Sequence, residues 1–105
     1  MVIEMFKAIA DENRLKILKI LSQGKLCACD ILENMDLSQP TVSHHLKILQ
    51  QAGLITVEKK GRWNYYSIID EKIEEMQTLL ESIRNKEIDI KVKKCDSDCD
   101  GTREG

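Results

Sequence analysis

The sequence predicts a mainly α-helical fold with one small β-hairpin. Apolar residues recur at helical spacing over most of residues 1–84, and Gly and Asp residues separate these segments. Residues 54–68 alternate apolar and polar side chains instead, which is typical of strands. A chain of 105 residues is long enough for one modest core. We therefore expect one domain over residues 1–84, followed by a charged and flexible tail over residues 85–105.

Two helices are expected before residue 25. The first covers residues 1–10, and Asp11 is a favourable N-cap for the second, which Gly24 would end. Their inner faces would carry Val2, Met5, Phe6, Ile9, Leu15, Ile17, Leu18 and Leu21.

The next two helices form a helix-turn-helix pattern. One is expected to begin near Cys27 as its N-cap and to end near Met35, with Asp30 at its third position. Ser38 would cap the following helix, and Gly53 would end it. This helix has two unlike faces. An apolar face is formed by Val42, His45, Leu46 and Leu49, and a polar face by Gln39, Thr41, Ser43, His44 and Lys47.

The alternating stretch predicts a hairpin, with a tight turn at Lys59-Lys60-Gly61 between its strands. A hairpin with a basic tip that follows a helix-turn-helix is a wing, so the fold class is a winged helix-turn-helix.

A last helix, capped by Asp70, carries more apolar side chains than one small core needs. These are Ile73, Met76, Leu79, Leu80 and Ile83. We expect it to pair with the first helix in a two-fold homodimer. The alternative is that both helices only complete the core of the monomer.

The charge of the chain is divided unevenly. Its net charge is −2, but residues 38–66 carry four basic residues against one acidic residue, a net charge of +3. This excess suits contact with DNA phosphates, although a merely solvated face is the simpler alternative. The expected contacts with double-stranded operator DNA are Gln39, Thr41, Ser43, His44, Lys47, Lys59, Lys60 and Arg62. No pairing of catalytic residues indicates an enzyme.

Four cysteines form two close pairs, Cys27 with Cys29 and Cys95 with Cys99. The sequence contains neither a long apolar run nor a signal-peptide pattern, so we expect a cytoplasmic protein without a membrane segment and with thiols rather than disulfides. Thiolates bind soft metal ions. The alternatives are inert packing thiols for the first pair and incidental cysteines in an acidic tail for the second. His45 lies on an apolar face, and we expect it to be partly buried rather than a metal ligand.

Taken together, these segments resemble the ArsR/SmtB family of metal-responsive winged-helix repressors. The markers are residues 10–18, 26–30, 38–49, 52–54 and 61–66. The resemblance implies a homodimer that binds its operator when metal-free and leaves it when an ion binds.

The pattern Cys27-x-Cys29-Asp30 is similar to that of the arsenic and antimony sensors of this family. The resemblance implies trivalent arsenic or antimony as inducer, held by three sulfurs. Leu32 stands where such sensors often have a third cysteine, so Cys95, Cys99, water or a small thiol would complete the site. Sensors of cadmium or lead add N-terminal cysteines, and zinc sensors use ligands along the last helix, of which Asp70 alone matches.

Cadmium, lead or zinc, or thiol oxidation, stay alternative signals. A thiol buffer that binds no DNA is a further alternative.

The spacing of the first pair suggests a switch. Two residues apart on a helix, side chains diverge by about 200°, whereas in an extended segment they point the same way. We therefore expect an ion that holds both sulfurs to unwind or re-aim the start of the third helix and so to shift the DNA-binding face.

Overall fold

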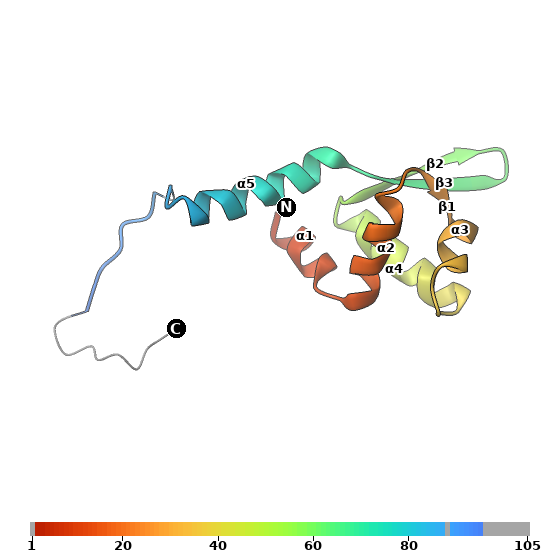
Figure 1. Cartoon of the computed structure of the whole chain (residues 1–105), viewed down its shortest axis with the longest axis horizontal. Helices are drawn as coiled ribbons and strands as arrows, with labels where there is room; N and C mark the ends of the chain where they lie inside the picture. Colours follow the sequence, from red (N-terminus) through yellow and green to blue (C-terminus); the bar gives the residue numbers. More distant parts are fainter. Residues whose placement is uncertain (1, 88, 96–105) are drawn as a thin grey trace.

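The computed structural model describes residues 2–87 and 89–95. Within these residues the chain forms five helices and a three-stranded antiparallel sheet of order β1-β3-β2. The elements are α1 (Val2–Ile9), α2 (Glu12–Leu21), β1 (Leu26–Cys27), α3 (Ala28–Glu33), α4 (Gln39–Gln51), β2 (Ile55–Lys60), β3 (Trp63–Ile68) and α5 (Asp70–Arg84). The helices α1 to α4 gather beside the sheet, and α5 leads away from them on the side opposite the wing (Figure 1). This architecture confirms the predicted winged helix-turn-helix.

The helix starts follow the predicted caps, with one shift, whereas α2 ends at Leu21 and α3 at Glu33, slightly earlier than predicted. The Asp11 carboxylate caps α2 by accepting the backbone N–H groups of Asn13 and Arg14, both at 3.0 Å. Asp70 was expected to cap α5 but is its first residue, and Ile69 occupies the N-cap. The reason is that the Ile69 N–H donates to the Leu54 carbonyl at 2.9 Å, which holds Ile69 in an extended conformation. Asp70 still places a negative charge in the first turn of α5.

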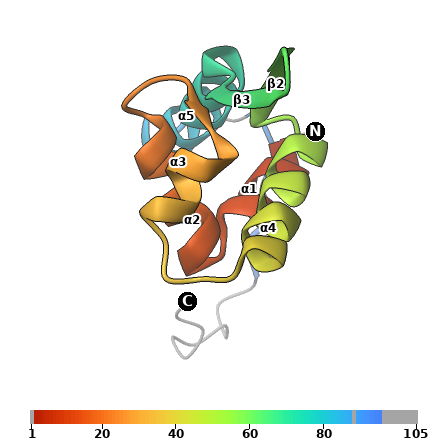
Figure 2. The ribbon, with the colours of Figure 1, turned by 90° about the vertical axis from the view of Figure 1, so that its right-hand side faces the viewer.

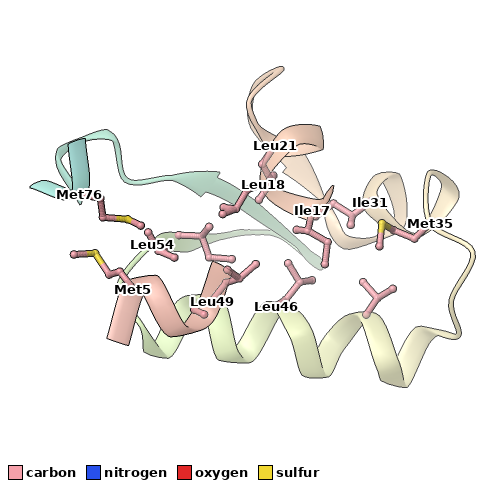
Figure 3. Packing of buried hydrophobic residues seen from close by; sticks show 13 residues of the cluster. Met5, Ile17, Leu18, Leu21, Ile31, Met35, Leu46, Leu49, Leu54 and Met76 are labelled. Carbon is pink, nitrogen blue, oxygen red and sulfur yellow. The ribbon is translucent and has the colours of Figure 1, made fainter. Parts of the chain in front are cut away.

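The core lies between α4, at the bottom of Figure 3, and the helices α1, α2 and α3. The apolar face of α4 is buried as predicted, with His45 beside it. Ile17 from α2, Ile31 from α3 and Leu49 from α4 are completely shielded from solvent. Leu15 was expected on the inner face of α2, but it is 40% exposed. It lies at the edge of the buried stripe, where it lines an apolar groove instead.

The wing differs from the prediction at its tip. Lys60 pairs with Trp63, so the turn consists of Gly61 and Arg62 rather than Lys59-Lys60-Gly61. Gly61 has a φ of 63°, which a glycine adopts at low cost as the first residue of a two-residue hairpin turn. Lys59 therefore belongs to strand β2.

A third strand, β1, was not predicted. Leu26 pairs with Tyr66 and Cys27 with Tyr65, so β1 extends the wing sheet along β3. Two residues are too short to show strand periodicity in a sequence. The pairing joins the first cysteine directly to the backbone of the wing.

The last helix is only partly buried. Met76 belongs to the core, but Leu80 and Ile83 are 54% and 57% exposed. Leu80 also lines an apolar groove of about 390 Å³ between α1, α2 and α5, together with Phe6, Ile9 and Leu15. Completing the monomer core therefore does not use the whole apolar face of α5. In the part of the chain that the structure describes, no helix has the length and hydropathy to cross a membrane.

Candidate functional site

The first cysteine pair lies where β1 passes into α3. Cys27 has an extended backbone (φ −85°, ψ 166°) and is the N-cap of α3, and Cys29 follows in the first turn of that helix. The Cys27 backbone N–H donates to Asp30 Oδ2 at 3.3 Å, so the predicted cap is formed. The two sulfurs and a carboxylate oxygen of Asp30 all lie within 4.8 Å of one another. The structure therefore assembles two thiols and one carboxylate at a single point.

This geometry bears on the expected switch. We expected one ion to hold both sulfurs only where the backbone is not helical, and therefore to unwind or re-aim the start of the third helix. Cys27 lies outside the helix and is extended, which brings its sulfur beside that of Cys29 while α3 is intact. The two sulfurs therefore come together without unwinding of α3, and a re-aiming of α3 by a bound ion stays a prediction.

The two thiols differ in environment. Cys27 is 7% exposed, whereas Cys29 faces solvent. The side-chain hydrogen bond with Cys27 raises the pKa of the Cys29 thiol, and desolvation and the nearby negative charge of Asp30 act in the same direction. A metal ion must displace protons to bind thiolates, so binding at this pair would release protons. An ion arriving from solvent would meet Cys29 first.

The site is adjacent to both parts of the expected DNA surface. Cys29 lines a cleft of about 220 Å³ between α3 and α4, together with Gln39 and Ser43 of α4. Cys27 is paired with Tyr65 of the wing strand β3. The two thiols therefore lie next to α4 and next to the wing, and these two parts of the molecule carry the expected DNA contacts.

Cys95, the described member of the second cysteine pair, does not lie at this site within one chain. Cys95 is exposed, and residues 89–95 follow α5 at the end of the molecule opposite α3 (Figure 1). Cys99 lies outside the described residues. Among the described residues of a single chain, the third donor beside Cys27 and Cys29 is Asp30 rather than Cys95. From the sequence, Asp30 was expected only to lie at the third position of the helix, where a negative charge suits the helix dipole.

The expected DNA contacts lie on α4 and the wing, and the wing strands β2 and β3 lie above α4 in Figure 2. Most are exposed: Gln39, Ser43, His44, Lys47, Lys59, Lys60 and Arg62. Thr41 is half-buried, and its Oγ1 lies 2.9 Å from Ser38 Oγ. His45 is buried and lies 3.2 Å from an Arg14 nitrogen, as expected for a histidine that is not a ligand.

One exposed aromatic residue of the wing was missed. Trp63 is 49% exposed and stands opposite Lys60 in the hairpin register. An indole between basic residues at a wing tip is suited to contact with DNA sugars and phosphates. The signal in the sequence was its position, directly after Gly61-Arg62.

Comparison with known proteins agrees with this arrangement. Residues 11–57 match the family described as "Bacterial regulatory protein, arsR family". An uncharacterised HTH-type transcriptional regulator of Methanocaldococcus jannaschii is 43% identical over 81 residues, covering 76% of this chain and 91% of the relative. The chain belongs to the ArsR family.

Two further relatives have names that specify a signal. The arsenical resistance operon repressor of Bacillus subtilis is 49% identical over 71 residues, which cover 67% of this chain and 68% of that repressor. A homologue of the cadmium resistance regulator from Staphylococcus aureus is 40% identical over 76 residues, covering 71% of this chain and 63% of the relative. The ArsR family consists of transcription regulators, and neither of these relatives bears the name of an enzyme.

A solved structure supports the fold. The homodimeric winged helix-turn-helix DNA-binding domain of a possible ArsR-family regulator from Mycobacterium bovis superimposes with a TM-score of 0.66 at 26% identity. The match covers 90% of this chain and 87% of that domain.

The thiol geometry generates a prediction. One equivalent of arsenite should protect both Cys27 and Cys29 from iodoacetamide, because the two sulfurs are close enough to share one arsenic atom. Mass spectrometry of the peptide that contains both residues measures the protection. In Cys29→Ser, Cys27 should lose most of its protection. Ser43→Ala, which alters the same cleft without removing a sulfur, is the control and should stay protected. Alkylation at equal rates with and without arsenite would contradict the shared site.

Proposed function

We propose that this protein is a homodimeric transcriptional repressor that binds operator DNA through α4 and the wing and is released when trivalent arsenic or antimony binds Cys27 and Cys29. One observation carries the proposal. Cys29 lines a cleft together with Gln39 and Ser43 of α4, and Cys27 is paired with the wing strand β3. A repressor of this kind acts in the cytoplasm, where its DNA is.

The DNA surface is supported by charge and exposure together. Polar side chains on the outer face of α4 suit contact with base edges in the major groove. Lys59, Lys60 and Arg62 on the wing supply the positive charge that phosphate binding needs. A thiol buffer would need neither feature, which favours the repressor.

The preference for arsenic or antimony rests on the donors and on the relatives. Two thiolates favour a soft ion, and the B. subtilis relative is an arsenical resistance repressor. Family resemblance implies three sulfurs, so Cys95 or Cys99 of either subunit, or a small thiol, would supply the third.

Cadmium, lead and zinc form the second candidate. The Asp30 carboxylate beside the thiols is a harder donor, which these ions accept more readily than arsenic does. The name of the S. aureus relative supports cadmium in the same way. Titration of DNA release with arsenite, cadmium, lead, zinc and peroxide in parallel decides between these signals.

Release follows from the position of the thiols. Drawing the two sulfurs onto one ion would move the first turn of α3 against α4 and β1 against β3. A change from 99% to 1% of the binding-competent form requires about 5.5 kcal/mol of differential affinity. Two or three bonds between thiolates and one ion are a sufficient source of that energy.

The DNA surface can be tested by two kinds of variant. Ser43→Ala with His44→Ala should weaken binding to the operator by about 1–3 kcal/mol, because these side chains would no longer reach the base edges. Lys60→Gln with Arg62→Gln should weaken binding to all duplexes and lower the salt slope by about 1 for each phosphate that is no longer neutralised. Fluorescence anisotropy at several salt concentrations measures both effects. Wild-type affinity and slope in both variants would refute the assignment.

The proposed dimer interface can be tested by placing a charge on helix α5. Leu80→Glu should give monomers at micromolar concentration and abolish tight operator binding, because it places a charge in the apolar groove. Thr78→Glu adds the same charge about 200° around the helix and is the matched control, which should stay dimeric. Sedimentation equilibrium measures the mass. A monomeric wild-type protein at that concentration would overturn the dimer.

The contribution of the tail to the metal site is tested by truncation. Cutting the chain after Lys94 removes Cys95 and Cys99. If one of them is a ligand, the truncated protein should require more arsenite for DNA release, and X-ray absorption should show two sulfurs per arsenic instead of three. A normal response with three sulfurs, measured with glutathione present, would assign the third position to the exogenous thiol. Cys27→Ser should bind DNA and ignore arsenite in either case.

A further inference from the structure

We infer that Arg14 is a positioning residue that holds the DNA-binding helix α4 in a fixed orientation relative to α1. This inference rests on the proposed function, since it concerns how the two α4 helices of a dimer are spaced on DNA. It assigns a role to the polar cluster of Arg14, His45 and Asp11, in which His45 is buried and the other two side chains are half-buried. Neither the metal site nor the DNA surface uses this cluster.

Arg14 connects three helices. It lies in the first turn of α2, and its Nε donates to the carbonyl of Ala8 in the last turn of α1 at 2.6 Å. Its Nη1 lies 3.2 Å from Nδ1 of His45 on α4. His45 is 9% exposed and is the buried polar side chain among the residues that the structure describes. One guanidinium thus bridges α1 and α4 through two separate nitrogens.

The chemistry of the pair determines the direction of its hydrogen bond. Arginine has only donors, so in this contact the Arg14 guanidinium donates and His45 Nδ1 accepts. On the other side, the Asp11 carboxylate accepts the Arg14 backbone N–H at 3.0 Å. This hydrogen bond lowers the pKa of Asp11, as does the guanidinium charge. Arg14 is therefore held by its own helix cap while it bonds to two neighbouring helices.

Directional bonds of this kind restrict motions that apolar packing permits. Apolar side chains tolerate small rotations of a helix, whereas a planar guanidinium with two acceptors does not. α1 lines the groove of the proposed dimer interface, and α4 carries the DNA contacts. In a dimer, this bridge would set the separation of the two α4 helices and therefore the half-site spacing. The His45 ring also lies 5.8 Å from that of His44, an expected DNA contact, so α4 and its contact residue would move together.

The test uses Arg14→Lys and His45→Leu with a palindromic duplex selected by the wild-type protein from a randomised library. Lysine keeps the charge but replaces the planar fork of two nitrogens by one flexible ammonium group, so it cannot hold Ala8 and His45 in the same fixed geometry. Both variants should lose at least tenfold in affinity for this duplex, while affinity for a scrambled duplex changes less than twofold. They should also discriminate less against duplexes whose half-site spacing is changed by one base pair.

Three controls show whether the loss of affinity and of spacing discrimination comes from the broken contact between Arg14 and His45. His45→Gln keeps a neutral acceptor and should recover most of the spacing discrimination. Lys16→Met, on an exposed position of the same helix, should behave like wild type. Sedimentation and circular dichroism establish that each variant is a folded dimer. If Arg14→Lys does not fold, His45→Leu and His45→Gln carry the comparison.

The outcomes separate this inference from the proposed function. Folded variants with wild-type affinity and wild-type spacing discrimination would overturn the positioning role and leave the repressor intact. An equal loss on selected and scrambled duplexes would also overturn it, because that is the effect of a missing charge or of general damage. A wild-type protein that selects no duplex and binds none would overturn both.

Discussion

Burial of one face of α4 constrains every other part of the molecule. Val42, Leu46 and Leu49 pack against residues from α1, α2 and α3 and from the start of the wing. Full burial of one such side chain contributes about 1.5–3 kcal/mol, so this face alone accounts for a substantial part of the stability of a small domain. Because the buried face is fixed, the opposite face, with Ser43 and His44, must point outward. The core therefore determines which residues can meet DNA.

The junction between β1 and α3 determines where chemistry can act on that surface. Cys27 pairs with the wing strand and caps α3, and Cys29 faces the cleft between α3 and α4. The site thus lies where three elements of the winged helix-turn-helix meet, and in the proposed mechanism small movements there would reach both α4 and the wing. The Lys25–Glu58 ion pair, with Nζ and Oε1 2.7 Å apart, adds a second link between the loop before β1 and strand β2.

The molecule uses apolar and polar contacts for different purposes. Apolar contacts hold the helices together and leave a groove beside α5 that a second copy of the chain can cover. The contact of Arg14 with His45 and Ala8 is directional, and it restricts how the helices are oriented. A regulator that must place two α4 helices at a set spacing on DNA benefits from both kinds of contact.

Elements with strong local signals could be predicted from the order of the residues. The cap at Asp11, the stop at Gly53, the two faces of α4 and the close thiol pair all depend on residues within a few positions of one another. Features that depend on distant residues emerged only from the folded chain. Examples are the pairing of Cys27 with Tyr65, the cleft that joins Cys29 to Ser43, and the contact of Arg14 with His45, which are 31 positions apart. Periodicity carries no information about such pairs, because each residue alone has an ordinary local environment. Likewise, the place of Asp30 in the first turn of a helix could be predicted from the sequence, but only the fold placed its carboxylate beside two sulfurs.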